Sequence, residues 1–436
     1  MDVASSRTQP RTPSTDIGKM DALVIKGGRP LNGRVAVSGA KNAALPVMAA
    51  TLLAPGVYRL RNCPQLVDTR TFGRVLETLG AKVAFAGGEC TIDTTNVNNF
   101  EAPYELVKTM RASIYVLGPL LARFGAARVS LPGGCAWGPR PVNLHLTGLQ
   151  AMGAQLDIEH GYIVGKGVKL HGASFSFDVV SVGATAQLLM AATLAEGTTV
   201  LDNVAIEPDI TVLGEVLAAC GARIEGLGSR RITVQGVKSL APIDTAIIAD
   251  RIEAATFAAA AAMTGGTITL ENVVPDHFEA SLRKLEETGC SIVRERDEVT
   301  VTGPKRPRAA DVTTAPFPGF PTDMQAQMMA VAAIADGTSV ITDTIYLDRF
   351  SHVPELGRMG ASIELKGNVA VVKGVERLSG APVMATDLRA SAALALAALV
   401  AEGETKISRI YHLDRGYENF DAKLTRLGAR VERIRE

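Results

Sequence analysis

The hydrophobic pattern repeats six times along the chain. Six stretches rich in alanine and leucine carry apolar residues on nearly every helical face, which is typical of buried helices. After each stretch comes a turn containing glycine and then alternating apolar and polar residues, which predict a strand. The six stretches are KNAALPVMAATLLA, RASIYVLGPLLARF, GATAQLLMAATLAE, RIEAATFAAAAAMT, DMQAQMMAVAAIAD and RASAALALAALVAE.

A second signature recurs between these stretches. Leucine, three residues, glycine, a small residue and an apolar residue appear in order six times, and the glycines lie 68 to 73 residues apart. The pattern predicts a second helix that ends at a glycine and leads into a strand. Repetition at so regular a spacing indicates a repeat architecture. The glycines are Gly80, Gly153, Gly221, Gly289, Gly360 and Gly428.

The two signatures together predict an α/β fold of six repeated units. Each unit alternates strands with one buried and one more exposed helix, and the length of a typical domain favours three units in each of two lobes. We expect residues 1–21 to form a flexible tail and residues 41–248 to form one lobe. The other lobe is expected to combine residues 22–40 with residues 249–436, because the last unit needs a partner from the chain start to close it.

Composition narrows the class of protein. The chain has 436 residues, 47% of them hydrophobic, and its 45 basic side chains balance 45 acidic ones, as in soluble proteins of two or more domains. Zero net charge argues against a nucleic-acid partner. The chain has no apolar run of membrane-spanning length and no secretory signal, and neither cysteines nor histidines have metal-ligand spacing. We expect a cytoplasmic protein without metal or other cofactor, and the pattern favours no particular oligomeric state.

The repeat separates one cysteine from the other four. Cys63, Cys90, Cys220 and Cys290 fall at strand or core-type positions, where a thiol behaves as a small hydrophobic group. Cys135 lies outside the repeat, in SLPGGCAWGPRP, whose glycines and prolines predict a loop. Because an exposed thiol without a role is a liability, Cys135 is a candidate for chemistry.

Charged and polar residues mark the first turns of the predicted buried helices. Acidic residues suit a helix N-terminus, but cations oppose the helix dipole there. Helix N-termini bind anions, and lysine and arginine add charge-assisted hydrogen bonds. The pattern therefore predicts a site for a multiply anionic small molecule. The residues are Lys41, Asn42, Lys108, Arg111, Ser181, Asp250, Arg251, Asp323, Asp387 and Arg389.

Two further arginines support this prediction. Arg140 ends the cysteine-containing loop, and Arg415 lies in YHLDRGYE, after the last turn glycine. Arg349 occupies the place that matches Arg415 in the fifth unit, and we expect it to form a surface salt bridge.

Eight ordered motifs resemble one family. They are SGAKNAALP, APYELVKTMRASI, SLPGGC, RPVNLH, VSVGAT, FPTDMQAQ, MATDLRAS and YHLDRGYE. From about residue 22 to the end, the chain resembles the UDP-N-acetylglucosamine 1-carboxyvinyltransferase branch of the enolpyruvyl transferases. That resemblance implies the inside-out α/β barrel fold, with six repeats in two lobes.

The resemblance also implies a reaction. Members of the branch transfer the enolpyruvyl group of phosphoenolpyruvate to the 3'-hydroxyl of UDP-N-acetylglucosamine and release phosphate, which begins peptidoglycan precursor synthesis. The implied catalytic residues are Cys135 as acid or nucleophile, Asp323 as base and Asp387 beside the reacting carbons. Phosphoenolpyruvate would contact Lys41, Asn42, Arg140, Arg389 and Arg415. The UDP-sugar would contact Arg111, Arg140, Pro141, Val142, Asn143, Leu144, Val180, Ser181, Val182, Gly183, Asp323 and Ile345.

The chain departs from the pattern of the branch in four places. Asn143 stands where aspartate is usual, Val179 replaces a frequent lysine, and Trp137 replaces a smaller aliphatic residue. The segment DRIEAATF stands where DRIETGTF is common. Loss of a lysine weakens diphosphate binding, so a related nucleotide sugar stays open as the acceptor.

Three other functions compete with this one. The cysteine motif argues against 5-enolpyruvylshikimate-3-phosphate synthase, which uses shikimate 3-phosphate. The retained acid and base argue against a non-catalytic protein that binds nucleotide sugars. A ring around DNA would need a basic inner surface, which the alanine-rich helices do not supply.

Overall fold

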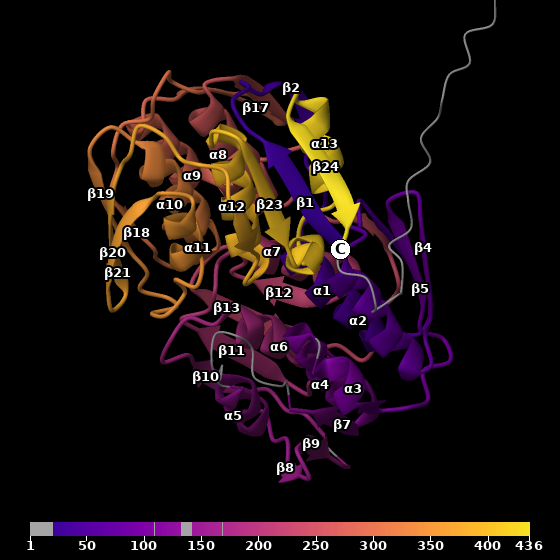
Figure 1. Cartoon of the computed structure of the whole chain (residues 1–436). Coiled ribbons are helices and arrows are strands. Elements are labelled where there is room, and N and C mark those ends of the chain that lie inside the picture. The colour runs from indigo at the N-terminus through magenta and orange to yellow at the C-terminus, as the bar shows by residue number, and fades with distance from the viewer. Residues whose placement is uncertain (1–20, 109, 132–141, 168) are drawn as a thin grey trace, which may run out of the picture.

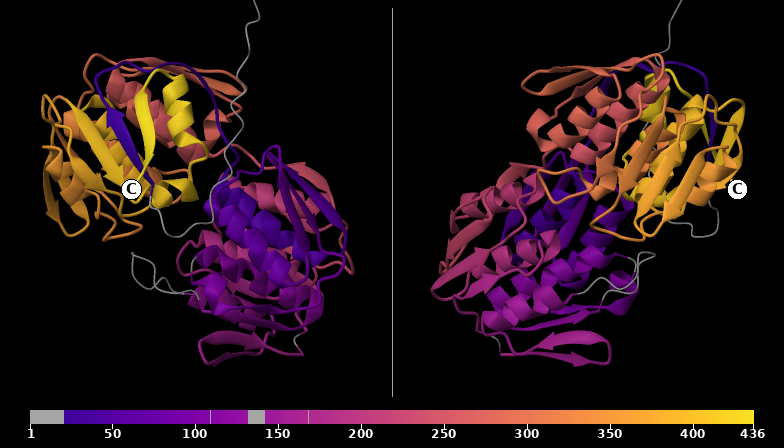
Figure 2. Two further views of the ribbon diagram at one scale, coloured as in Figure 1. Left: turned by 45° about the vertical axis from the view of Figure 1, so that its right-hand side comes forward. Right: turned by 90° about the vertical axis from the view of Figure 1, so that its left-hand side faces the viewer.

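The computed structural model describes residues 21–108, 110–131, 142–167 and 169–436. Its buried apolar side chains gather in two clusters. One cluster is drawn from residues 40–247, and the other from residues 23–37 and 252–429. Figure 2 shows two bodies side by side, with the indigo N-terminal strands inside the orange and yellow one.

Within the described residues, the strands form six four-stranded sheets with one pattern: a parallel pair at one edge, then two antiparallel pairs. Three sheets belong to the first cluster. In spatial order their strands are β14 (Asp244–Ala246), β3 (Val57–Arg61), β5 (Glu89–Asp93) and β4 (Lys82–Ala86); β6 (Glu101–Ala102), β7 (Ala127–Ser130), β9 (Tyr162–Gly165) and β8 (Leu156–Glu159); β10 (Ser174–Ser176), β11 (Thr198–Asp202), β13 (Arg231–Gln235) and β12 (Arg223–Glu225).

The other three sheets surround the second cluster. In the same order their strands are β2 (Asn32–Ala36), β15 (Thr267–Glu271), β17 (Glu298–Thr302) and β16 (Ser291–Arg294); β18 (Val312–Thr313), β19 (Thr338–Thr342), β21 (Val369–Lys373) and β20 (Ser362–Lys366); β22 (Pro382–Met384), β23 (Glu404–Ser408), β1 (Asp21–Lys26) and β24 (Arg430–Arg435). The chain start therefore supplies β1, which pairs antiparallel with both β23 and β24.

Alanine-rich helices fill the interior of each body (Figure 1). They are α1 (Lys41–Ala50), α4 (Leu117–Phe124), α6 (Val182–Ala192), α8 (Arg251–Thr264), α10 (Gln325–Ile334) and α12 (Leu388–Val400). The alternate helices keep exposed faces and are α2 (Val67–Thr78), α5 (Asn143–Ala151), α7 (Pro208–Ala219), α9 (Glu279–Glu287), α11 (Val353–Arg358) and α13 (Phe420–Arg426). Shorter turns are α3 (Tyr104–Val107) and the 3-10 segments η1 (Thr51–Leu53), η2 (Arg111–Val116), η3 (Pro275–His277), η4 (Thr322–Met324) and η5 (Ile410–Arg415).

The repeated glycines end the alternate helices, as the sequence predicts. All six have φ between 90° and 107°, a left-handed conformation in which a side chain is strained. The mixed α/β class is likewise confirmed. Cys63, Cys90, Cys220 and Cys290 are buried, which confirms their predicted core positions.

One helix start differs from the prediction. Lys108 does not belong to the buried helix, because it caps the short α3 and pairs with Glu105 at the surface. The buried segment begins at Arg111 as the tighter turn η2 and continues as α4. Gly118 and Pro119 lie in this segment, and both disfavour a regular helix interior.

Two paired segments connect the bodies. Gly39 lies opposite Ala249 in an isolated β-bridge. The Ala40 amide donates to the Ile248 carbonyl at 2.7 Å, and the Asp250 amide donates to the Ser38 carbonyl at 2.8 Å. We call these two connecting segments, residues 38–40 and 248–250, the crossing. Their hydrogen bonds fix the direction in which α1 and α8 leave it.

We expect Gly39→Ala to destabilise this crossing. A Cβ at Gly39 would lie 1.9 Å from the Asn62 carbonyl oxygen, so the backbone must shift. Overpacking of this kind lowers the free energy of unfolding by about 1–3 kcal/mol, which urea denaturation measures. The control is Gly357→Ala inside α11, where a Cβ meets no atom within 4 Å. That variant should be as stable as the parent or slightly more stable. Equal loss in both variants would contradict the prediction.

Candidate functional site

Cations at the starts of three buried helices are paired with carboxylates from other elements. Lys41 Nζ lies 3.4 Å from Asp68 Oδ2. Arg251 Nε lies 3.6 Å from Asp209 Oδ2, and Arg389 Nη2 lies 2.9 Å from Asp323 Oδ2. Carboxylates of the protein itself thus neutralise part of the positive charge at these helix starts.

Asp323 lies between two arginines. It belongs to η4, just before α10, and its Oδ1 accepts a hydrogen bond of 2.8 Å from Arg349 Nη1 while Oδ2 accepts one from Arg389. Burial alone would raise the pKa of the Asp323 carboxyl, but the charges of Arg389 and Arg349 outweigh burial and hold that pKa well below its ordinary value. Asp323 is therefore a carboxylate at neutral pH.

Arg389 is held from two sides. Its side chain is 1% exposed, and its guanidinium carbon lies 5.4 Å from the centre of the Tyr417 ring. Among the described residues, no hydrogen-bond acceptor meets its Nε or Nη1. Buried donors of this kind are costly unless an acceptor joins them. The arrangement suits an anionic ligand.

Asp387 caps α12. Its Oδ1 accepts hydrogen bonds from the amides of Arg389 at 2.8 Å and Ala390 at 3.1 Å, as N-capping requires. The other oxygen lies 3.5 Å from the hydroxyls of Ser351 and Thr386. Asp387 thus fixes the start of the helix that carries Arg389.

Lys41 and Arg415 meet on one carboxylate. Arg415, in η5, donates from Nε to Asp68 Oδ1 at 2.8 Å, and Lys41 contacts the other oxygen of the same side chain. Burial lowers the pKa of Lys41, and Asp68 opposes this effect while Arg389 and Arg415 add to it. The cations of α1, α12 and η5 are therefore close enough to influence one another. Asn42, the next residue of α1, is exposed.

Most of the described residues predicted for the UDP-sugar lie at the starts of α5 and α6. Ser181 caps α6 by accepting from the Ala184 amide at 3.3 Å. A Cβ at Gly183 would lie 3.1 Å from His145 Nε2, so a larger residue there would press on the imidazole. Val142, Asn143 and Leu144 lie at the start of α5, and Val180 and Val182 lie at the start of α6. Arg111 begins η2, and Ile345 follows β19 in the second body.

Two aromatic groups complete this region. Burial lowers the pKa of His145 to about 4, and the charge of Arg111 lowers it further, so the imidazole is neutral at pH 7. Burial raises the pKa of Tyr115 to about 12, and the charges of Asp209 and Arg111 act on the same phenol in opposite directions. The region offers hydrogen-bonding groups and the cation of Arg111, which acts on both His145 and Tyr115.

Three predicted site residues lie outside the described part of the chain. They are Cys135, Arg140 and Pro141.

Two residues of the site were not predicted. The expectation that Arg349 forms a surface salt bridge is wrong, because Arg349 is 7% exposed and binds Asp323. Arg349 occupies the same place in its unit as Arg415 does in the next unit, and this match was the signal that Arg349 could belong to the site. Asp68 had no such signal, since it lies on the outer helix α2 and not at the start of a buried helix.

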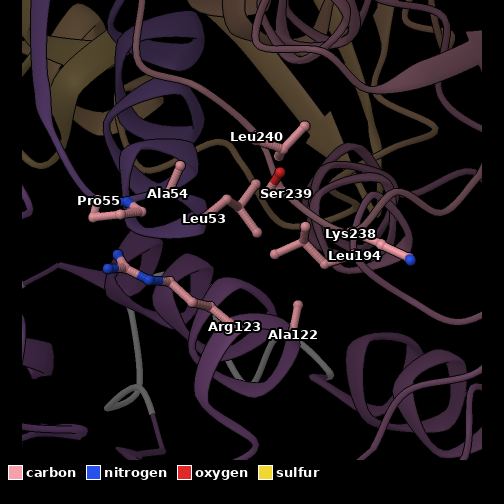
Figure 3. A pocket seen from close by; sticks show the side chains of 9 residues that line it. All are labelled: Leu53, Ala54, Pro55, Ala122, Arg123, Leu194, Lys238, Ser239 and Leu240. Carbon is pink, nitrogen blue, oxygen red and sulfur yellow. The ribbon is translucent and has the colours of Figure 1, made fainter.

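Two recesses lie elsewhere on the described part of the chain, and they share only Arg251 with the helix-start cations above. One of about 230 Å³ opens near the C-terminal ends of the buried helices in the first body (Figure 3). Its lining includes Leu53 at the end of η1, Ala122 in the last turn of α4 and Leu194 just after α6. Another of about 320 Å³ lies beside Arg251 and Phe317. Of the predicted helix-start residues, only Arg251 lines either recess.

Within the described ranges, no group of three or more His, Cys, Asp or Glu residues is placed to hold a metal ion. None of the helices in the described part of the chain has the length and apolar character needed to cross a bilayer.

Comparison with known proteins identifies the family. The model of the EPSP synthase (3-phosphoshikimate 1-carboxyvinyltransferase) family matches residues 25–424. A protein of Geobacter metallireducens named UDP-N-acetylglucosamine 1-carboxyvinyltransferase is 57% identical over 96% of this chain and all of its own length. One of the same name from Thermodesulfovibrio yellowstonii is 54% identical over 95% of this chain and all of its own length.

Solved structures support the same fold. The enolpyruvyl transferase NikO from Streptomyces tendae superimposes with a TM-score of 0.86 at 28% identity, covering 96% of this chain and all of NikO. EPSP synthase from Acinetobacter baumannii gives a TM-score of 0.75 at 18% identity, covering 95% of this chain and all of that protein, and so supports the fold alone. The chain therefore belongs to the enolpyruvyl transferase family described by the EPSP synthase model, and its near-full-length relatives are named UDP-N-acetylglucosamine 1-carboxyvinyltransferase.

Proposed function

We propose that this enzyme transfers the enolpyruvyl group of phosphoenolpyruvate to the 3'-hydroxyl of UDP-N-acetylglucosamine, with release of phosphate. The observation that carries the proposal is the gathering of Lys41, Arg389 and Arg415 around the carboxylates of Asp68 and Asp323. Phosphoenolpyruvate bears a phosphate and a carboxylate, and cations in a partly buried site bind both groups strongly. The names of the near-full-length relatives favour UDP-N-acetylglucosamine as the acceptor.

The proposed reaction is an addition followed by an elimination. Asp323 takes the proton from the sugar hydroxyl, whose oxygen attacks C2 of phosphoenolpyruvate while an acid protonates C3. Loss of a proton from C3 then breaks the bond between C2 and the phosphate oxygen, which leaves an enol ether and phosphate. One acid and one base are sufficient for both steps. Cys135 is the proposed acid, or a nucleophile that forms a covalent adduct, and Asp387 is proposed to lie beside the reacting carbons.

Binding of phosphoenolpyruvate is proposed to activate Asp323. A carboxylate that two arginines hold is a weak base, and an effective base has a pKa near the working pH. The anionic groups of phosphoenolpyruvate compete with Asp323 for Arg389 and Arg349. As these arginines turn to the substrate, Asp323 loses positive neighbours and becomes a better base.

The contacts proposed for the substrates follow from the helix starts. Lys41, Asn42, Arg140, Arg389 and Arg415 hold phosphoenolpyruvate. The UDP-sugar contacts Asp323 and Ile345 on one side of the junction, and on the other it contacts Arg111, residues 140–144 and residues 180–183. We propose that both substrates are used in the cytoplasm, in peptidoglycan precursor synthesis, and that neither a metal nor a cofactor takes part.

We also propose the inside-out barrel of six units in two lobes, formed by residues 41–248 and by residues 22–40 with 249–436. The six like sheets and the two buried clusters support this division.

The first test is phosphate release from phosphoenolpyruvate. We expect release with UDP-N-acetylglucosamine, none with shikimate 3-phosphate, and loss of release in Cys135→Ala. Cys220→Ala is the matched control, because Cys220 is a buried thiol of the core. Release with shikimate 3-phosphate alone would overturn the assignment of the acceptor. Phosphate release by Cys135→Asp separates the two roles of the thiol, since a carboxyl group can donate a proton but forms no thiol adduct. Retained release would support the acid role, and lost release would favour the nucleophile.

The second test concerns Asp323. In Arg349→Gln one of two cations is lost while burial persists, so the pKa of Asp323 rises. Because Asp323 must be ionised to accept a proton, kcat/KM of the variant should fall as the pH becomes weakly acidic, where the parent stays active. Arg358→Gln is the control, since Arg358 is 56% exposed and faces Glu355. If kcat/KM falls at the same acidic pH in the parent, Arg349→Gln and Arg358→Gln, the proposed role of Arg349 is contradicted.

The third test concerns Val179. Its side chain is 66% exposed and precedes the N-terminus of α6, so Val179→Lys places a cation where the diphosphate is proposed to bind. We expect KM for UDP-N-acetylglucosamine to fall about threefold or more at low salt, and less at high salt, because salt screens exposed charges. Val57→Lys, at a 51% exposed position on β3, should leave KM unchanged. A fall of the same size in both variants would show a general charge effect instead.

A further inference from the structure

Asp68 joins cations from the two bodies of the molecule. Its carboxylate lies on the first turn of α2, in the first body, and its side chain is 6% exposed. Lys41 approaches Oδ2 from α1 of the same body. Arg415 reaches across from η5 of the second body, with Nε 2.8 Å from Oδ1 and Nη2 3.5 Å from Oδ2.

Stability alone is a poor explanation for this contact. Burying a charge pair costs several kcal/mol of desolvation, and apolar replacements are often as stable. An exposed ion pair would avoid that cost, as Arg61 and Asp244 do at 57% and 54% exposure. The buried carboxylate lies instead where cations from both bodies meet.

The charges around Lys41 show what Asp68 contributes. Burial and the neighbouring cations Arg389 and Arg415 all favour neutral Lys41. Asp68 and Asp323 act in the opposite direction, and Asp68 is the stronger of the two. Because Asp323 is already shared by two arginines, Asp68 is the carboxylate that balances Lys41 and Arg415.

We propose that Asp68 is a positioning residue that holds Lys41 and Arg415 together across the junction, so that both cations face the phosphate of phosphoenolpyruvate as it binds. This inference rests on the proposed function for the identity of the donor. Asp68 touches neither substrate in this scheme, because it acts through the two cations. Preorganisation of this kind lowers the cost of binding, since the side chains are already ordered.

The test compares Asp68→Asn with Asp68→Glu. Asparagine keeps the shape of the side chain and removes its charge. We expect KM for phosphoenolpyruvate to rise about tenfold or more, while kcat and KM for UDP-N-acetylglucosamine change much less. The alkaline limb of kcat/KM should move to lower pH in the same variant, because Lys41 loses the carboxylate that keeps it protonated. Asp68→Glu, which retains the charge, should restore part of both effects.

Asp244→Asn is the matched control. It removes a carboxylate that pairs with an arginine at 2.9 Å on the exposed edge of the sheet of β3. The control should keep the parent KM and pH profile. Unchanged KM for phosphoenolpyruvate and an unmoved alkaline limb in Asp68→Asn would overturn the inference.

Binding of inorganic phosphate separates this inference from the proposed function. Calorimetry on the full chain without either substrate should show weaker phosphate binding in Asp68→Asn than in the parent and in Asp244→Asn. If the parent transfers no enolpyruvyl group but this difference is found, the proposed function fails and the positioning role stands. Equal phosphate affinities in the three proteins would overturn the positioning role.

A double-variant cycle covers the case in which Asp68→Asn folds poorly. If Asp68 acts through Arg415, adding Asp68→Asn to Arg415→Gln should raise KM for phosphoenolpyruvate far less than it does in the parent. Urea denaturation of each variant reports loss of stability independently. Additive effects on KM, with no coupling between the two positions, would contradict the inference.

Discussion

The structure depends on how a cation at the start of a buried helix is neutralised. Such a cation loses hydration and also meets the positive end of the helix dipole, so it needs a nearby carboxylate. Lys41, Arg251 and Arg389 each obtain one from an element far along the chain. Arg251 with Asp209, and Arg415 with Asp68, are ion pairs that join the two bodies. Correct pairing therefore requires that both bodies are folded and placed against each other.

The sequence predicted the features that depend on local chemistry. A glycine at the end of a helix, an alanine-rich buried helix and an apolar cysteine each leave a signal within a few residues, and the structure has all three. The helix-start positions of Lys41, Asp323, Asp387 and Arg389 were predicted for the same reason, because these residues recur at one place in the repeat. Their contacts with substrates stay predictions. Lys108 was assigned to the wrong helix because it lies only three residues before Arg111, where the buried segment begins, but it ends the separate short helix α3.

Local sequence patterns did not predict ion pairs between residues that are far apart in the chain. Arg349 was expected at the surface, since nothing near it in the sequence indicates that it folds onto Asp323, 26 residues earlier. Asp68 pairs with Arg415, which lies 347 residues later, and no periodicity connects the two. Only the packing of α2 against η5 brings them together. The residues missed by the sequence are therefore those whose partner is set by tertiary structure.

The charged side chains are divided between the two bodies, which accounts for a proposed substrate site at the junction and not inside one body. The first body contributes Lys41 and its carboxylate Asp68, a nearly neutral pair. The second contributes Arg389 and Arg349 on Asp323, with Arg415 nearby, and so carries an excess of positive charge. Neither set alone combines a strong anion site with a surface for a large acceptor. In the proposed scheme, the helix starts and cations of both bodies act on one ligand, and an incoming dianion replaces the carboxylates as the partner of the cations.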